Sequence, residues 1–370
     1  MNQGMLELLF KLQEMPMAPA KRLAEEIGRS TPTVISWLKK LARDKMFLGV
    51  KPDLKVHLLG LEIYDFLLDV TSHEALLRIE EFCEKHPYTL YRARVFGGTR
   101  HGMLVQFRQP PEALPHLQEA FETMRNSGLV EGVTELPTLQ RVYGSTYTRP
   151  LLEAWDSERM VWIFDWERWW NSEIAEPDMQ TDRVGSSKTT SSRVEIDELD
   201  AKILQILTDN ARQKNIEVIR KLGLNPREGS TQQRISKRIV KLRQVIDSYR
   251  VFINWMYFDV YNTPMVLAKA SSDITRTLIG KLQRGTFPFS SSIRSMPDGF
   301  VWYARLPSAH LSELVSLVWR ICDSYELLII DYKHSQTYGL WAETFDQKTG
   351  NWRSDWDFCI EKPLRAIGLR

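Results

Sequence analysis

The sequence predicts an α+β protein in which two helix-turn-helix domains alternate with two domains of element order βαββαβ. Two observations predict this fold. First, the 370-residue chain repeats a set of aromatic and acidic positions at an offset of about 190 residues, and a fixed offset indicates internal duplication. Second, each half opens with short amphipathic helices and then alternates between the hydrophobic periods of strands and helices.

Composition narrows the class of protein. Lys and Arg number 49 and Asp and Glu number 47, so at a net charge of +2 any basic surface must be local. Cys83, Cys322 and Cys359 are far apart, which disfavours a zinc site or a disulfide framework and fits a reducing compartment. The chain shows no signal-peptide pattern, and no apolar run reaches about 20 residues. We therefore expect a cytoplasmic protein without a membrane partner, a metal or a cofactor.

The first helix-turn-helix domain is expected over residues 1–50. A helix over Ala20–Ile27 ends at Gly28, which accepts the left-handed conformation of a helix end. Ser30 or Thr31 can cap the next helix, which runs to about Asp44. We expect its hydroxyl groups to hydrogen-bond to base edges and its Lys and Arg side chains to contact phosphates. The predicted DNA-binding residues are Thr31, Thr33, Ser36, Lys39, Lys40 and Arg43.

A βαββαβ domain with a Trp-rich extension is expected over residues 51–170. Strands are predicted over Ile63–Val70, Thr89–Phe96, Gly102–Phe107 and Val130–Leu136, and helices over Glu74–Lys85 and Leu114–Asn126. This order is that of the ferredoxin-like fold. Such an antiparallel sheet carries helices on one face and leaves the other face for a partner sheet.

The repeated aromatic positions form two Trp-rich extensions, one in each half. They are Thr146-Tyr147, Trp155-Asp156, Trp162 and Asp165-Trp166, then Thr337-Tyr338, Phe345-Asp346, Trp352 and Asp355-Trp356. We interpret each as a β-hairpin packed against the preceding domain, with Gly350 in the second turn. An aromatic platform for bases is the alternative, although few basic residues lie among the rings. The Ser- and Thr-rich residues 171–195 predict a flexible linker.

The second half repeats this organisation. Residues 196–250 are expected to form a second helix-turn-helix domain, with a recognition helix over Thr231–Val245. Its predicted DNA-binding residues are Thr231, Gln232, Gln233, Arg234, Ser236, Lys237, Arg238 and Lys241. The alternative is a three-helix domain with a solvated charged face, but the repetition of the motif favours DNA binding.

A second βαββαβ domain and Trp-rich extension are expected over residues 251–370. The predicted strands are Met265–Ala270, Ser290–Ser295, Phe300–Leu306 and Leu327–Tyr332, and the predicted helices are Ile274–Leu282 and Ala309–Cys322.

Two segments of the second half resemble the Lrp/AsnC family of prokaryotic transcription regulators. IDELDAKILQILTDNAR, from Ile196, is similar to the family's opening helix, and RISKRIVKL (Arg234–Leu242) to its recognition helix. The resemblance implies winged-helix domains, RAM/ACT-like ferredoxin domains and a small-molecule effector such as an amino acid. The turns between middle strands give the implied effector-binding residues Gly97, Gly98, Arg100, Asp298 and Gly299. Trp37 departs from the pattern, because the family usually has arginine there.

We therefore expect a sequence-specific, DNA-binding transcription regulator of Lrp/AsnC type rather than an enzyme. Its two halves are expected to pair within one chain, with a higher homo-oligomer left open. Two alternatives remain. Siroheme decarboxylases share the Lrp-like architecture, although this chain lacks the Arg-Arg-Phe-Gly-Ala-like segment expected of them. The other alternative is a nonspecific architectural protein that binds double-stranded DNA.

Overall fold

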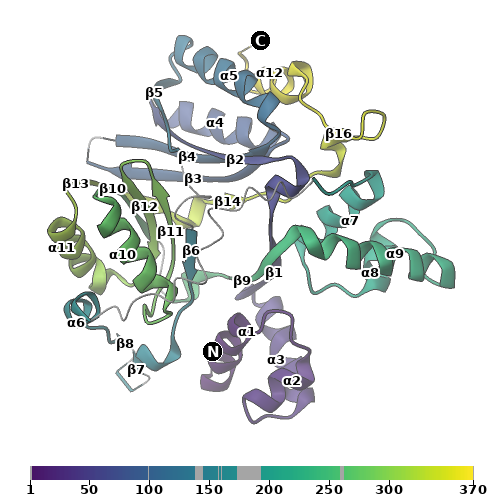
Figure 1. The fold of residues 1–370 in the computed structure, drawn as a ribbon, viewed down its shortest axis with the longest axis horizontal. Helices are drawn as coiled ribbons and strands as arrows, with labels where there is room; N and C mark the ends of the chain where they lie inside the picture. Colours follow the sequence, from purple (N-terminus) through teal and green to yellow (C-terminus); the bar gives the residue numbers. More distant parts are fainter. Residues whose placement is uncertain are drawn as a thin grey trace.

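The computed structural model describes residues 2–98, 100–137, 145–156, 158–159, 161–172, 193–258 and 262–369. It confirms a mixed architecture of helices and antiparallel sheets (Figure 1). The predicted linker, residues 171–195, lies almost entirely outside the described residues. In the part of the chain that is described, no helix has the length and apolar character needed to cross a bilayer.

The N-terminal helical module comprises α1 (Gln3–Glu14), α2 (Ala20–Glu26) and α3 (Thr31–Arg43). The Ser30 side chain caps α3 by accepting a hydrogen bond from the backbone of Thr33. Trp37 packs against α1, since a Cβ atom on Gly4 would lie 2.5 Å from its ring. This contact explains the departure at position 37, because the tryptophan serves the packing of the module.

The second helical module comprises α7 (Glu198–Asp209), α8 (Asn215–Lys221) and α9 (Gly229–Leu242). The helix α9 is shorter than the predicted range, because a 3₁₀ turn replaces its last residues at Arg243–Val245. The strands β1 (Phe47–Leu54) and β9 (Ile246–Ile253) follow the two modules and pair antiparallel, with Val50 opposite Val251. The two modules are therefore joined by a two-stranded sheet (Figure 1).

Two runs of strands and helices share the order βαββαβ. The first is β2 (Glu62–Val70), α4 (His73–Lys85), β3 (Thr89–Gly97), β4 (Arg100–Gln109), α5 (Leu114–Asn126) and β5 (Val130–Glu135). The second is β10 (Asn262–Lys269), α10 (Ser272–Gln283), β11 (Ser290–Met296), β12 (Gly299–Arg305), α11 (Leu311–Ile321) and β13 (Ser324–Asp331). Pairing of β3 with β13 joins the eight strands of both runs into one sheet, and one strand from each extension brings the total to ten.

The helix-free faces of the two runs contribute to a shared core. Leu67 and Leu104 of the first run belong to the same buried cluster as Met265 and Val301 of the second. Because side chains alternate along a strand, Met103 and Val105 on β4 point the other way, into the core beneath α4 and α5. Helices therefore cover the outer faces of the sheet (Figure 1).

Each Trp-rich extension crosses to the opposite run. In the first, β6 (Ser145–Thr148) pairs with β11, the hairpin is β7 (Trp155–Asp156) with β8 (Val161–Trp162), and α6 (Trp166–Asn171) follows. In the second, β14 (Gln336–Thr337) pairs with β3, the hairpin is β15 (Phe345–Asp346) with β16 (Asn351–Trp352), and α12 (Lys362–Ala366) follows. Packing against the preceding domain was thus the wrong expectation. Within its own run, β11 is an edge strand, and pairing with β6 provides hydrogen-bond partners for the backbone groups at that edge.

Candidate active site

On α3, the six predicted DNA-binding residues lie along the exposed side of the helix. Ser36, Lys39, Lys40 and Arg43 are exposed, and Thr31 and Thr33 are half-buried. The Thr33 hydroxyl lies 2.8 Å from the Ser30 hydroxyl, so it takes part in capping the helix.

On α9, four of the predicted DNA-binding residues have internal partners, one of which is Gln232, whose side-chain amide donates to the Pro226 carbonyl at 2.5 Å. Thr231 is buried, and its hydroxyl donates to the Glu228 carboxylate at 2.9 Å. Arg238 and Lys241 form ion pairs at 2.7 and 2.9 Å with Asp200, which is fully buried. A buried carboxylate needs such compensation, so these two cations stabilise the module. The exposed residues are Gln232, Gln233, Arg234 and Lys237, and Ser236 is half-buried.

The five implied effector-binding residues lie at two hairpin turns. Gly97 and Gly98 lie at the turn from β3 to β4, where Arg100 Nε contacts Asp69 at 3.2 Å and Glu326 at 3.1 Å. Asp298 and Gly299 form the turn from β11 to β12. The turn at Gly97 and Gly98 has a structural role, because Arg100 already forms ion pairs with Asp69 on β2 and Glu326 on β13. None of the five residues lines either hollow described below.

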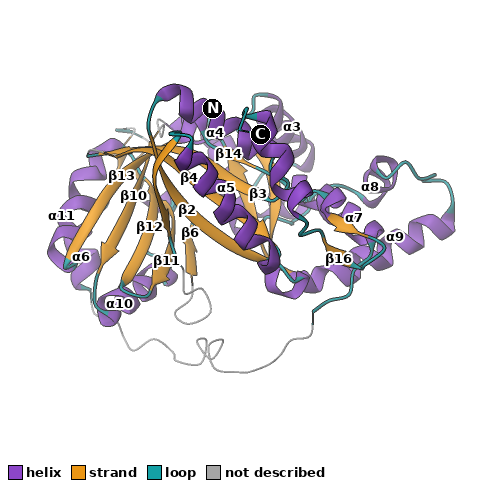
Figure 2. Ribbon diagram, turned by 90° about the horizontal axis from the view of Figure 1, so that it is seen from above, coloured by secondary structure: helices purple, strands orange, loops and turns teal. Residues whose placement is uncertain are grey.

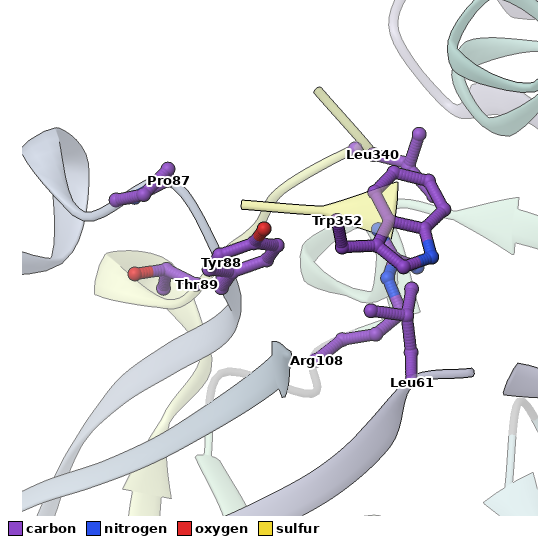
Figure 3. A pocket seen from close by; sticks show the side chains of 8 residues that line it. Leu61, Pro87, Tyr88, Thr89, Arg108, Leu340 and Trp352 are labelled. Atoms are coloured by element: carbon purple, nitrogen blue, oxygen red, sulfur yellow. The ribbon is translucent and has the colours of Figure 1, made fainter. Parts of the chain in front are cut away.

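A small hollow lies where the first run meets the second extension (Figure 3). It is lined by Leu61, Pro87, Tyr88, Thr89, Arg108, Gly339, Leu340 and Trp352. Its volume is about 10 Å³, which corresponds to roughly one water molecule. The hollow therefore has room for one small polar group.

Two strand ends and one hairpin position the lining residues. Helix α4 stops before Pro87, and Tyr88 then leads into β3. At the end of β4, the Arg108 backbone N–H donates to the Tyr88 carbonyl at 2.8 Å. The β15–β16 hairpin closes the hollow, since Trp352 Nε1 donates to the Leu59 carbonyl at 2.6 Å. Figure 3 shows the Arg108 side chain running toward Trp352.

The Arg108 guanidinium group is an uncompensated cation. Burial lowers the pKa of Arg108 to about 10, so the group stays charged at neutral pH. Among the described residues, none forms an ion pair or a side-chain hydrogen bond with it. Arg108 is half-buried, and its guanidinium nitrogens are not among the buried polar atoms that lack a partner, so they keep contact with solvent. A half-buried cation without a counter-charge is a suitable place for an anion, because pairing offsets the desolvation of both charges. A carboxylate matches the planar donor pair of arginine.

Two further groups define the chemistry of the hollow. The Tyr88 hydroxyl donates to the Arg353 carbonyl at 2.6 Å, and burial raises the pKa of this phenol, so it keeps its proton. His86 Nδ1 accepts a hydrogen bond from the Tyr88 backbone at 3.2 Å, and burial lowers the pKa of His86 to about 3. The hollow thus combines a cation and a protonated phenol, and the neutral His86 imidazole lies behind Tyr88 among aromatic rings rather than in the lining.

Sequence reasoning missed Tyr88 and Arg108 entirely. Arg108 precedes Gln109-Pro110 at a strand end, and neither it nor Tyr88 belongs to a recognisable motif. Trp352 was identified as a repeated aromatic residue, but its contact with Leu59 depends on the crossing of the extension. Only the three-dimensional pairing brings these residues together.

No protein-family model matches the chain, and no curated protein matches its sequence. Among solved structures, the siroheme decarboxylase NirDL matches with a TM-score of 0.53 and 13% identity, covering 89% of this chain and 91% of that one. The same enzyme in co-complex with an iron-uroporphyrin III analogue matches with a TM-score of 0.51. An AsnC family transcriptional regulator from Agrobacterium tumefaciens matches only 36% of this chain, with a TM-score of 0.31 and 20% identity.

These comparisons correct two predictions. The architecture that spans most of the chain is shared with the siroheme decarboxylase NirDL, which is named as an enzyme. The prediction of a sequence-specific transcription regulator is therefore wrong, and so is the prediction that the chain is not an enzyme. The helix-turn-helix pattern misled because one architecture can carry unrelated functions.

Proposed function

We propose that this chain is an enzyme that removes carbon dioxide from a carboxylate-bearing, siroheme-like tetrapyrrole. The observation that carries the proposal is the fold shared with a siroheme decarboxylase over 89% of this chain and 91% of the other. The unpaired Arg108 in the hollow supports it, because a guanidinium group without a counter-charge suits an anionic ligand.

In this proposal Arg108 binds the substrate carboxylate. The bond between the carboxylate carbon and its methylene carbon breaks, carbon dioxide leaves, and the electron pair remains on the methylene carbon conjugated to the pyrrole. A proton then replaces the lost group, and no oxidant is needed. The apolar walls contributed by Leu61 and Leu340, which lie outside the β15–β16 hairpin, disfavour the localised carboxylate charge relative to the dispersed charge of the transition state.

Tyr88 is the proposed proton donor, since it remains protonated at neutral pH. Its hydroxyl is engaged by the Arg353 carbonyl while the hairpin is closed. The hollow as it stands holds about one water molecule, so neither the carboxylate group nor the tetrapyrrole ring enters it unless its walls move. We therefore place the ring where the β15–β16 hairpin now lies. Outward movement of that hairpin admits the ring and frees the Tyr88 hydroxyl in one step.

We also propose that the two βαββαβ runs arose by duplication and form a pseudo-dimer within one chain, over residues 51–170 and 251–370. Support comes from the shared element order, the β3–β13 pairing and the crossed extensions. In this arrangement residues 1–50 and 196–250 are two helical domains, and residues 171–195 connect the halves.

The test is to mix the purified chain with siroheme under anaerobic conditions and follow its absorbance and the mass of the products. We expect a spectral shift on binding and products lighter by the mass of carbon dioxide. Arg108→Met should lower the rate by about 100-fold, because it removes a charge-assisted pair. Arg305→Met is the matched control, since Arg305 ends β12 as Arg108 lies at the end of β4, and it should retain activity. A wild-type chain that neither binds nor alters siroheme would refute the proposal.

A further inference from the structure

Helix α11 exposes an aromatic residue that the fold does not require. Trp319 is 76% exposed, more than any other large apolar side chain described. Helix α5 holds the same place in the first run, and the two helices bury matching positions: Leu117 with Leu314, Ala120 with Leu317, and Phe121 with Val318. The residue that corresponds to Trp319 is Glu122, which pairs with Arg125. Because a glutamate satisfies the fold there, Trp319 calls for an explanation outside the fold.

A hollow of about 690 Å³ lies beside Trp319, between α6 and α11. It is lined by Phe164, Asp165, Trp166, Glu167, Glu313, Ser316, Leu317, Trp319 and Arg320. Its floor is aromatic and aliphatic, and its rim carries charges of both signs. Both helices lie at the outer edge of the molecule, away from the two helical modules (Figures 1 and 2).

The exposed face of α11 is complementary to itself. Glu313 lies in the first turn, Arg320 lies in the last, and the small Ser316 lies between them. Glu313 is three residues before Ser316 and Arg320 four residues after it, or about 4.5 and 6 Å along a helix axis. Two antiparallel copies of α11 that cross at Ser316 would therefore place each Arg320 near the Glu313 of the other copy. Within one chain Arg320 lies 3.7 Å from Glu167, an exposed pair that Arg320 would share or exchange on association. Antiparallel helices also align opposite ends of their dipoles.

We propose that α11 and the adjacent hollow form a twofold interface with a second copy of this chain. Trp319 of each copy enters the hollow of the other and contacts Leu317 and Trp166 there, and two Glu313–Arg320 pairs flank the axis. Tryptophan and arginine are the residue types that most often dominate binding energy at interfaces. An isologous contact closes on itself and gives a dimer rather than a filament.

The first experiment measures the mass of the full-length chain by sedimentation equilibrium over a range of concentrations. We expect a dimer for the wild type and at least a 100-fold weaker association for Trp319→Glu, which installs the residue found at the corresponding position of α5. Leu77→Glu is the matched control, because Leu77 is an exposed apolar residue on α4, and it should leave the dimer intact. A monomeric wild type, or an unchanged mass for Trp319→Glu, overturns the proposal.

The second experiment tests the orientation through charge exchange. Glu313→Arg alone and Arg320→Glu alone should each weaken the dimer, and both changes in one chain should restore it, because each new charge then meets its opposite across the axis. A double variant as weak as the single variants overturns the antiparallel arrangement. Siroheme turnover by the Trp319→Glu monomer keeps this test separate from the proposed function, since Trp319 lies outside the Arg108 hollow.

Discussion

The two hairpins cover corresponding ends of the two runs, but they cover them differently. Under the β7–β8 hairpin, aromatic rings fill the space: Phe164, Trp166, Trp169, Phe287 and Phe289 lie with ring centroids 5.3–6.3 Å apart. Under the β15–β16 hairpin lie a phenol, a guanidinium group and a small hollow. One end is filled by aromatic rings, and the other holds a guanidinium group that has no counter-charge among the described residues.

This difference assigns separate roles to the two ends. Aromatic rings contribute large buried areas and favourable edge contacts, so the filled end stabilises the fold. An uncompensated cation costs stability, and proteins retain such groups where function requires them. The filled end has few polar contacts: His310 Nδ1 accepts from Trp166 Nε1 at 3.2 Å, whereas the buried Trp302 Nε1 has no partner. The contrast therefore directs attention to Arg108.

The largest expected effect follows from opening the filled end. Trp166→Ala removes a ring that is 5% exposed and leaves a cavity among Phe164, Phe287 and Phe289. We expect the free energy of unfolding to fall by about 3–5 kcal/mol. Urea unfolding followed by far-UV circular dichroism measures it. Ile163→Ala, at an exposed neighbouring position, should cost about 0.5 kcal/mol or less. Equal losses for the two variants would contradict a structural role for the filled end.

The next effect is the pH dependence of the free energy of unfolding that His86, behind Tyr88, should cause. Burial lowers the pKa of His86 to about 3, below its ordinary value of 6.5, so the folded chain favours the neutral ring. This contribution to stability is complete above pH 6.5 and is lost as the pH falls toward 3. Between pH 6.5 and 5 it should decline by about 1.4 kcal/mol per unit, or about 2 kcal/mol. The measurement is urea unfolding at a series of pH values.

The matched variant is His86→Asn, whose side-chain oxygen can accept the Tyr88 backbone hydrogen bond that Nδ1 now accepts. It should show a flatter dependence of stability on pH across the same window. If the stabilities of the variant and the wild type decline in parallel, the pKa of His86 is not lowered by folding, and this prediction is wrong.

Local sequence patterns predicted much of the fold. The helix predicted over Leu114–Asn126 is α5 with the same bounds, because hydrophobic period and capping act within a few residues. The crossing of the extensions was not predicted, since β6 and β11 pair across more than a hundred residues and nothing in either segment specifies its partner. Arg108 was not identified from the sequence for the same reason, because its lack of a counter-charge depends on residues that are distant in sequence. The helix-turn-helix pattern was legible but did not determine function.

A smaller effect of opposite sign should come from Arg108. Arg108→Met replaces an uncompensated cation with an apolar chain of similar length, so we expect the free energy of unfolding to rise by about 1–2 kcal/mol. The same unfolding assay measures this gain while turnover of siroheme is lost. Arg92→Met should instead destabilise the chain, because Arg92 forms an ion pair with Glu80 at 2.9 Å. A destabilised Arg108→Met chain would show that the guanidinium group serves the fold.

The smallest effect, that of Tyr88→Phe, is one half of a reciprocal exchange between the two ends. Tyr88→Phe removes the hydrogen bond to the Arg353 carbonyl and should cost about 1 kcal/mol. Phe289→Tyr adds a hydroxyl among the rings of Phe164, Trp166 and Phe287, where a buried unsatisfied donor costs about 1–3 kcal/mol. Each end should thus reject the residue of the other, although the two positions lead into corresponding strands. If urea unfolding shows that Phe289→Tyr is neutral, the filled end contains an acceptor or a water site, and the division between a structural end and a chemical end no longer holds.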